Sequence, residues 1–386
     1  MDLPDPRRWF SDDEIERARR YHRPGYIRAV IGAVVSFAYL AVLAFTDLGD
    51  AIADAVGAAV VDVAFVVVGA SILGLPLRAW GFAHERRWGF AKQSWRGWFG
   101  DWAKGVAIGL VVTSGILIGY LTLADAMPDS WVWVAAPLAA GVVFVLSFLA
   151  PVVFEPLFNH FDPLDDAELA GSLRALSVQA GVPVRDVLVA DASKRTTKEN
   201  AYVSGLGATR RVVVYDTLLG RGSAQDVRLV VAHELGHRRD GHVLKGTLTA
   251  ALGAVVVAVL VFVLLGSDAV LRAIGATGPG DPRVVPFVLL VAGAAGALSD
   301  PLGMAISRRW ERAADRASIE LTGDRDGFAA MEHDLSIANM SELAPSRPAY
   351  LLTFSHPAPA ERIAAALEGG AIAGEVRSNV GPTAGM

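Results

Sequence analysis

The sequence contains no cysteine, and this absence removes two classes of structure. Disulfide-stabilised folds are excluded, and so are metal sites that are built from thiolates. Any metal in this protein has to be bound through histidine, aspartate or glutamate side chains. The chain has only 8 histidines, so a closely spaced pair of them is informative.

Charged residues are also scarce. Asp, Glu, Lys and Arg make up 19% of the chain, below the roughly 25% of soluble domains. Apolar residues make up 53%, and the mean hydropathy is +0.40. The net charge of -5 lacks the basic excess that nucleic-acid binding requires. The composition therefore predicts a membrane protein with no nucleic-acid partner.

The first residues are polar and charged, and they have neither the apolar core nor the cleavage site of a signal peptide. Further along, several stretches are apolar enough to cross a bilayer as helices, which takes about 20 residues each. The predicted spans are residues 25–46, 55–77, 105–124, 131–154, 246–266 and 285–306. Asp62 and Asp300 fall inside two of them. An acid at membrane depth usually faces protein or water, and the alternative is a misplaced span boundary.

Lysine and arginine are distributed unevenly around these spans. They are concentrated before the first span and in the loop at 78–104, whereas the loops after the first and third spans contain aspartate but no lysine or arginine. The positive-inside rule then predicts that both termini, the 78–104 loop and residues 155–245 lie in the cytoplasm. We expect a protein of the cell (inner) membrane with its metal site on the cytoplasmic side.

The region 155–245 is polar and has the pattern of a soluble α+β insert. Amphipathic periodicity predicts a helix over 166–181, and valine-rich runs predict short strands at 186–191 and 210–216. A further helix is expected to begin after Ser223, which is a suitable N-cap.

HELGH at 233–237 has the spacing of the HExxH zinc-binding motif. Residues i and i+4 of a helix share a face, so His233 and His237 can present ring nitrogens to one Zn²⁺. Glu234 lies between them, where it can act as general base on a water molecule that the zinc makes acidic. The alternative is a helix with two surface histidines. The apolar VRLVVA run before the motif and Gly236 within it favour the zinc site.

A catalytic zinc site needs a third protein ligand. His242 is nearest, but its spacing misses HExxHxxGxxH by one residue, which favours a supporting or surface position. Glu311 is the stronger candidate, because it lies on the helix that follows the last span. Asp315 is one turn further on and could accept a hydrogen bond from a ligand histidine. The alternative is that both acids are surface residues paired with arginines of the same helix. The spacing alone supports the two interpretations equally.

Five further segments carry a family resemblance. They are LPLRAWGFAHERRWGFAKQSWRGWFGDWAKG at 75–105, EPLFNHFDPL at 155–164, DASKRTTKENAYVSGLGATRRVVVYDTLL at 191–219, SRRWERAAD at 307–315 and SHPAPAERIAAAL at 355–367. Together with HELGH, these segments resemble the membrane-integral CAAX prenyl proteases of type I, the a-factor-converting zinc metallopeptidases. The resemblance covers residues 12–365 and is to a bacterial-type member.

This resemblance implies that Glu311 is the third zinc ligand and that Asp315 is an acid supporting the site. It also implies that Asn200 and His356 act at the scissile bond, because Asn can hold a substrate backbone and His can stabilise a developing oxyanion. One Zn²⁺ per chain is the implied cofactor. The valine-rich strand at 211–215 could receive an extended substrate by strand addition.

The expected fold class is a multi-pass α-helical membrane protein with about six transmembrane helices and a zincin-like α+β metallopeptidase domain. By resemblance, the helices form a ring around a water-filled chamber. The expected domains are an N-terminal cytoplasmic segment (1–24), four spans (25–154), the α+β insert (155–245), two spans (246–306), a helical catalytic part (307–369) and a disordered tail (370–386).

The expected function is zinc-dependent hydrolysis of peptide bonds by a membrane endopeptidase of CAAX prenyl protease type. The family acts on prenylated C-terminal peptides, but the Ala-, Gly- and Arg-rich composition indicates a bacterial source, where such substrates are not expected. The alternatives are a quality-control protease without prenyl specificity and a non-catalytic membrane scaffold. The expected partners are the bilayer and a peptide or membrane-protein substrate, with or without a lipid.

Overall fold

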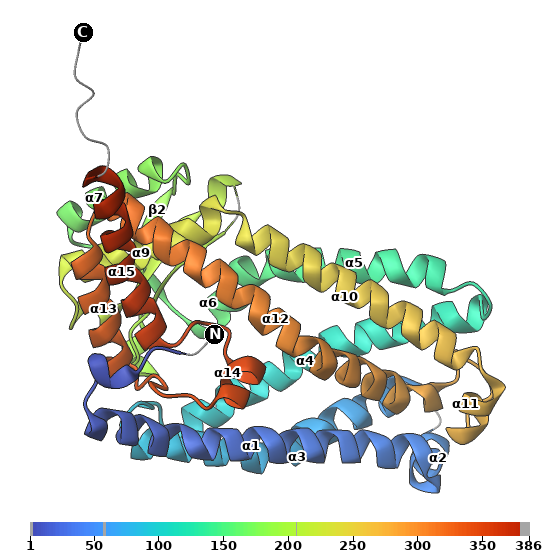
Figure 1. The fold of residues 1–386 in the computed structure, drawn as a ribbon. Helices are drawn as coiled ribbons and strands as arrows, with labels where there is room; N and C mark the ends of the chain where they lie inside the picture. Colours follow the sequence, from blue (N-terminus) through green and yellow to red (C-terminus); the bar gives the residue numbers. More distant parts are fainter. Residues whose placement is uncertain (1–2, 57–58, 206, 379–386) are drawn as a thin grey trace. The chain divides into compact units, whose positions relative to one another are not determined.

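The computed structural model describes residues 3–56, 59–205 and 207–378, and the chain divides into two compact units (Figure 1). The helical unit comprises Pro24–Ala150 and Lys245–Ser299. The α/β unit comprises Met1–Arg23, Pro151–Leu244 and Asp300–Met386. Each unit is described separately.

Six helices of the described residues are long and apolar enough to cross a membrane, which confirms the predicted number of spans. They are α1 (Asp12–Phe45), α3 (Ala59–Arg87), α4 (Trp95–Ala126), α5 (Val132–Leu149), α10 (His242–Leu265) and α12 (Val285–Thr322). After α5 a short π-helical turn, η2 (Ala150–Phe154), leads into α6 (Glu155–Phe158). The other helical elements before α12 and outside the α/β unit are α2 (Asp47–Val56), α11 (Asp268–Ala273) and η5 (Pro282–Val284).

The helical unit packs around an aromatic centre. The ring of Trp131 makes edge contacts with Tyr120 and Phe262, and Trp131 is only 2% exposed. Other apolar residues of this unit are exposed, such as Val111 on α4 and Leu298 on α12, which are 73% and 84% exposed. Large exposed apolar surfaces are unstable in water, so this surface requires the apolar surroundings of a bilayer.

Asp62 does not lie in the middle of its span. It is the fourth described residue of α3, it is buried, and it shares a small pocket with Arg283. Asp300, within α12, is exposed.

The α/β unit contains a four-stranded sheet in the order β1-β2-β4-β3. Its strands are β1 (Phe161–Pro163), β2 (Asp186–Ala190), β3 (Ala201–Ser204) and β4 (Arg211–Tyr215). β2 and β4 are parallel, and the other two pairs are antiparallel. The predicted strands at 186–191 and 210–216 are confirmed as β2 and β4. β1 and β3 escaped sequence analysis because they are too short to show an apolar alternation.

Helices cover this sheet and one another in the α/β unit (Figure 1). They are α7 (Ala167–Gln179), α8 (Asp216–Leu219), α9 (Ala224–Arg239), α13 (Arg325–Ala338), α14 (Arg347–Thr353), α15 (Pro359–Ser378), and the short helices η1 (Pro6–Arg8), η3 (Ala192–Lys194) and η4 (Gly207–Thr209). The C-terminal part of α12 also belongs to this unit, and Gly323 ends it with φ 70°. The tail predicted to be disordered from residue 370 is helical as far as Ser378, and residues 379–386 lie outside the described residues.

Gly236 allows α9 and α12 to approach closely. A Cβ atom at this position would lie 2.7 Å from Ala317 Cβ and 3.2 Å from Ala314 Cα. A hydrogen bond of 2.8 Å from Ser318 Oγ to Leu229 C=O ties the same two helices together. Small residues on both sides therefore determine the distance between the helix that carries HELGH and the helix that carries Glu311.

We expect Gly236→Ala to destabilise the protein by about 1–3 kcal/mol, because the added methyl group has to push α12 away from α9. The measurement is the unfolding midpoint of the protein in detergent. Gly171→Ala on α7 is the matched control, since a Cβ there meets no atom within 4 Å. That change should stabilise the protein by about 0.5–1 kcal/mol. Equal effects of the two substitutions would show that the close approach is not needed.

Candidate metal centre

The helix α9 is fixed at its start by a capping box. Ser223 Oγ accepts a hydrogen bond from Asp226 N–H at 3.1 Å, and the Asp226 carboxylate accepts one from Ser223 N–H at 2.8 Å. The apolar residues that follow are almost fully buried, so the helix cannot rotate about its axis. Three turns on, His233 and His237 lie on one face, with their Nε2 atoms 3.1 Å apart.

Glu311 on α12 completes a triangle with these two nitrogens. Its Oε2 lies 3.3 Å from His233 Nε2, and its Oε1 lies 3.3 Å from His237 Nε2. Ligands at about 2.0–2.1 Å from a tetrahedral ion are separated by about 3.3–3.4 Å. Glu311 Oε2 is buried and has no hydrogen-bond partner among the described residues. The three side chains could therefore hold a metal ion, and their spacing fits one.

Asp315 supports the outer side of this triangle. Its Oδ1 lies 2.9 Å from His233 Nδ1, the ring nitrogen that faces away from the triangle, so Asp315 can accept a hydrogen bond from that N–H. Arg362 of α15 in turn binds Asp315, with Nε donating to Oδ2 at 3.0 Å. The same guanidinium pairs with Glu332 of α13 at 2.6 Å. Sequence analysis did not identify Arg362 and Glu332 as parts of the site. The one feature that could have pointed to Arg362 is its place in the SHPAPAERIAAAL segment, six residues after His356.

His242 supports the second histidine. Its Nδ1 lies 3.0 Å from His237 Nδ1, and its ring stacks on Trp310 with centroids 5.3 Å apart. His242 is 6% exposed, so the prediction of a supporting position agrees with the structure and a surface position does not. In a metal-binding arrangement His237 Nδ1–H donates to His242, which fixes the ring plane of His237.

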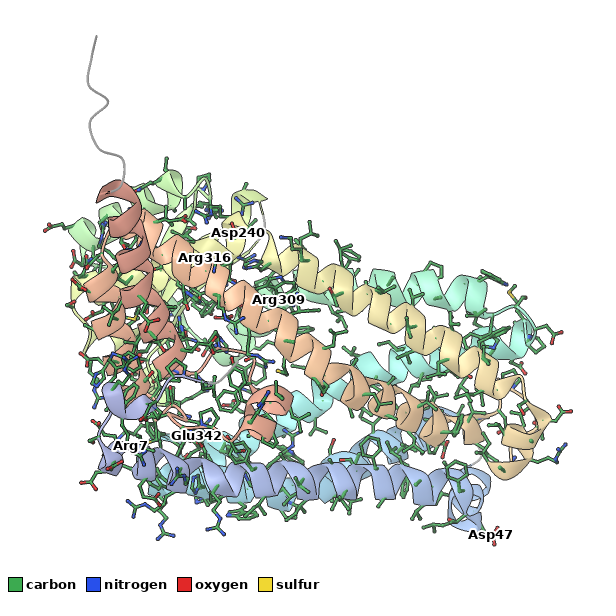
Figure 2. The ribbon with its side chains drawn as sticks, in the orientation of Figure 1. Arg7, Asp47, Asp240, Arg309, Arg316 and Glu342 are labelled. Carbon is green, nitrogen blue, oxygen red and sulfur yellow. The ribbon has the colours of Figure 1, made fainter. Side chains whose placement is uncertain are left out.

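The arginines of α12 do not neutralise Glu311 and Asp315. Arg308 donates to the Tyr350 and Phe354 carbonyls, and Arg312 donates to Glu361 at 2.8 Å. Figure 2 shows Arg309 and Arg316 on α12, and both are exposed. The interpretation of Glu311 and Asp315 as surface acids paired with these arginines is therefore wrong.

Electrostatics favour a cation at the triangle. Burial by itself lowers the pKa of His233, but the neighbouring carboxylates of Asp315 and Glu311 outweigh it and raise the pKa of His233 to about 10. Burial raises the pKa of Glu234, and the neighbouring histidines partly oppose this effect. The surroundings of His233 are thus strongly anionic.

The other two predicted site residues are His356, which lies near the triangle, and Asn200, which does not contact it. His356 Nε2 lies 3.4 Å from Glu311 Oε2, and its Nδ1 lies 2.8 Å from Ser355 Oγ. The side chain of His356 is 60% exposed, so it is near the triangle and open to solvent. Asn200 immediately precedes β3 and is exposed, but no contact among the described residues joins it to the triangle.

Comparison with known proteins identifies the family. Residues 163–369 match the family described as Peptidase family M48. This chain belongs to peptidase family M48. Residues 4–160 match the region described as CAAX prenyl protease N-terminal, five membrane helices. The described part of that range has four candidate spans, α1, α3, α4 and the one that begins with α5.

Relatives cover most of the chain. The Bacillus subtilis (strain 168) protein named "Uncharacterized metalloprotease YhfN" is 26% identical over 93% of this chain and 87% of its own length. The "CAAX prenyl protease 1" of Saccharomyces cerevisiae is 28% identical over 76% of this chain and 69% of its own. The M48 protein described here is accordingly a multi-pass membrane metalloendopeptidase that acts on peptides.

A solved structure has the same fold. It is described as "Crystal Structure of S. mikatae Ste24p", and it superposes with a TM-score of 0.79 at 22% identity. The match covers 95% of this chain and 91% of that one. The predicted fold class, a multi-pass helical membrane protein with a metallopeptidase domain, is confirmed.

We expect a divalent ion that binds the triangle to release about one proton near neutral pH. In the metal-free protein a pKa of about 10 keeps His233 protonated, and the ion has to displace that proton. Metal affinity should therefore rise about tenfold per pH unit between pH 7 and 9. Calorimetric titration in two buffers of different ionisation enthalpy measures the released proton. A heat of binding independent of the buffer would contradict this expectation.

Proposed function

We propose that this M48 protein is a zinc-dependent membrane endopeptidase of CAAX prenyl protease type. The observation that carries the proposal is the triangle of two imidazole nitrogens and one carboxylate with edges of 3.1–3.3 Å. The donor set of two nitrogens and one oxygen, with no thiolate in the chain, suits a catalytic zinc site that keeps one position open.

His233, His237 and Glu311 would hold the zinc. When bound, it supplies Lewis acidity, which polarises a peptide carbonyl and makes a water molecule acidic near neutral pH. Glu234 takes the proton from the attacking water and passes it to the leaving amine. The raised pKa of Glu234 supports this role, because a base with a pKa closer to neutrality can also return the proton as an acid.

The neighbouring residues would orient these groups. Asp315 and His242 would each accept a hydrogen bond from the outer N–H of one ligand histidine, and Arg362 keeps Asp315 ionised and in place. His356 is solvent-accessible beside Glu311, where it can donate a hydrogen bond to the oxyanion that develops on the scissile carbonyl. Asn200 would hold the substrate backbone.

Strand addition by a substrate would use β3. β4, the strand expected from sequence to receive a substrate, has β2 and β3 on its two sides and no free edge. That expectation is wrong for β4, because β3, which is too short to be recognised from its sequence, already occupies the second edge of β4. β3 is the terminal strand, it follows Asn200 directly, and it contacts α9. An extended peptide at the edge of β3 would lie along the helix that carries HELGH.

The names of the relatives support a proposal for the substrate class. The yeast "CAAX prenyl protease 1" and the Arabidopsis thaliana "CAAX prenyl protease 1 homolog" match 76% and 78% of this chain, which supports a C-terminal peptide, with or without a prenyl group, as substrate. The alternative is a quality-control protease without prenyl specificity. The non-catalytic scaffold that was considered from sequence does not fit a member of peptidase family M48 with a buried, metal-sized triangle. No nucleic acid is expected as a partner, because the net charge is -5.

We further propose that both termini and the metal site lie on the cytoplasmic side of the cell membrane. The support is the distribution of lysine and arginine, which are frequent in residues 7–23 and in residues 78–104, the stretch around the turn from α3 to α4. Residues 47–54, after α1, and residues 125–129, at the end of α4, contain aspartate without lysine or arginine.

We expect Glu234→Gln to lower kcat for peptide cleavage by about 10²–10⁴-fold, because the amide keeps the shape of the carboxylate but cannot take a proton. The zinc content should not change. The measurements are cleavage of a fluorogenic peptide and elemental analysis of the purified protein. Glu320→Gln is the control, since Glu320 is an exposed acid on α12. A Glu234→Gln protein that cleaves at the wild-type rate would refute the general-base role.

A further inference from the structure

A second cavity lies in the α/β unit, and none of the residues that line it belongs to the metal triangle. It has a volume of about 210 Å³ and lies between α13, the first part of α9 and the turn before α9. The side chains of Arg221 and Asp334, which line it, are 64% and 83% exposed, so the cavity opens to solvent. A bound water needs only about 10–15 Å³, and drug-sized ligands fill about 300–1,000 Å³. The cavity therefore suits a small organic molecule.

Part of the cavity wall is apolar. Leu218, Val230 and Met331 line it, and all three side chains are buried in the α/β unit. A bare ion would leave this wall without a contact, whereas an alkyl chain would pack against it. The wall therefore favours a ligand with an aliphatic part.

Four charged residues line the same cavity, and they are Glu199, Asp226, Asp334 and Arg221. Three carboxylates and one guanidinium give a net charge of −3 + 1 = −2 when all are ionised. Among the described residues, only the metal triangle brings three such ligand groups within 4.8 Å of one another. The carboxylates of the cavity are thus too widely spaced for one metal ion, and two separated positive charges would match them better.

Glu199 is the acid of this cavity that most needs a partner. It is 8% exposed, and its Oε1 is buried without a hydrogen-bond partner among the described residues. Arg221 Nη1 lies 3.6 Å from this oxygen, which is too long for a hydrogen bond. A buried carboxylate oxygen without a hydrogen bond costs free energy. A ligand that donates to Glu199 would remove this cost.

The backbone of Glu199 is fixed by Asn339, the C-cap residue of α13. Asn339 Oδ1 accepts a hydrogen bond from Glu199 N–H at 2.8 Å, and Asn339 Nδ2 donates one to Glu199 C=O at 2.9 Å. The carboxylate is therefore held in place at the cavity. Burial raises the pKa of Glu199, Arg221 opposes this effect, and Asp226 and Asp334 reinforce it. A bound cation would favour the ionised carboxylate.

We propose that this cavity binds a small aliphatic diamine, with one ammonium group at Glu199 and the other near Asp226 and Asp334. The alkyl chain between the two ammonium groups packs on the apolar wall. The ligand donates the hydrogen bond that Glu199 Oε1 lacks, and its two positive charges neutralise the cavity. The inference does not depend on the proposed function, because none of these residues takes part in the proposed catalysis.

The test is equilibrium dialysis of cadaverine, pentylamine and pentanediol against the purified full-length protein in detergent. These compounds have alkyl chains of the same length and carry two, one and no positive charges. We expect cadaverine to bind about tenfold or more tightly than pentylamine, because pentylamine lacks one hydrogen bond between charged groups. Pentanediol should not bind measurably.

Substitutions at the cavity should change cadaverine affinity in opposite directions. Glu199→Gln should weaken binding about 10- to 100-fold, because it removes the charge of the buried acceptor. Asp334→Asn should weaken it about two- to fivefold, and Arg221→Met should tighten it by a similar factor, since both residues are exposed. Glu168→Gln on α7 is the matched control, because Glu168 is exposed and does not line the cavity.

A lysine side chain of a peptide is the other source of an alkylammonium group, and N-acetyl-lysine amide tests for it. The proposal is overturned if this amide binds more tightly than cadaverine, if pentylamine binds as tightly as cadaverine, or if cadaverine does not bind. It is also overturned if Glu199→Gln binds like the control. Arg221→Met keeps the test decisive if Glu199→Gln fails to fold, because unchanged affinity in Arg221→Met would contradict binding in this cavity.

Discussion

The close approach of α9 and α12 is the constraint on which the metal centre depends. Gly236 meets Ala314 and Ala317 without any intervening side chain, and the ligands of the triangle come from both helices. Metal–ligand distances vary by only about 0.2 Å. A larger residue at this contact would push α12 away from α9, and even a small shift of Glu311 would then take its carboxylate out of reach of the metal. Glu311 lies on the same continuous helix as the last candidate membrane span, because α12 is part of that span and does not begin after it.

Buried charge is the second feature of the centre. Glu311, Asp315 and Glu332 are buried around one arginine, Arg362, whose pKa is raised mainly through Asp315 and Glu332 against the opposing effect of burial. Burial of charges without partners is strongly unfavourable, so the excess of acids is stable only when a cation balances it. In the metal-free protein, a proton on His233 balances part of this negative charge. A divalent ion balances more of it, because it carries two positive charges. The negative charge of Asp315 also holds the His233 ring in place through the contact between Asp315 Oδ1 and His233 Nδ1.

Sequence reasoning recovered the parts of the site that local periodicity encodes. His233 and His237 share a helix face whatever the tertiary structure, and the apolar spans follow from composition. Glu311 could be chosen over the arginine-paired alternative only by family resemblance, because its role depends on how α12 packs on α9. β3, Arg362 and the pairing of Asn339 with Glu199 left no periodic signal. Each of them depends on contacts between residues far apart in the chain.

We propose that His233, His237 and Glu311 together hold one metal ion. X-ray absorption at the zinc edge of the purified protein would detect these ligands. We expect two imidazole nitrogens and oxygen ligands at about 2.0–2.1 Å, with one imidazole lost in His237→Ala. A spectrum with no imidazole scattering, or one unchanged by that substitution, would contradict it.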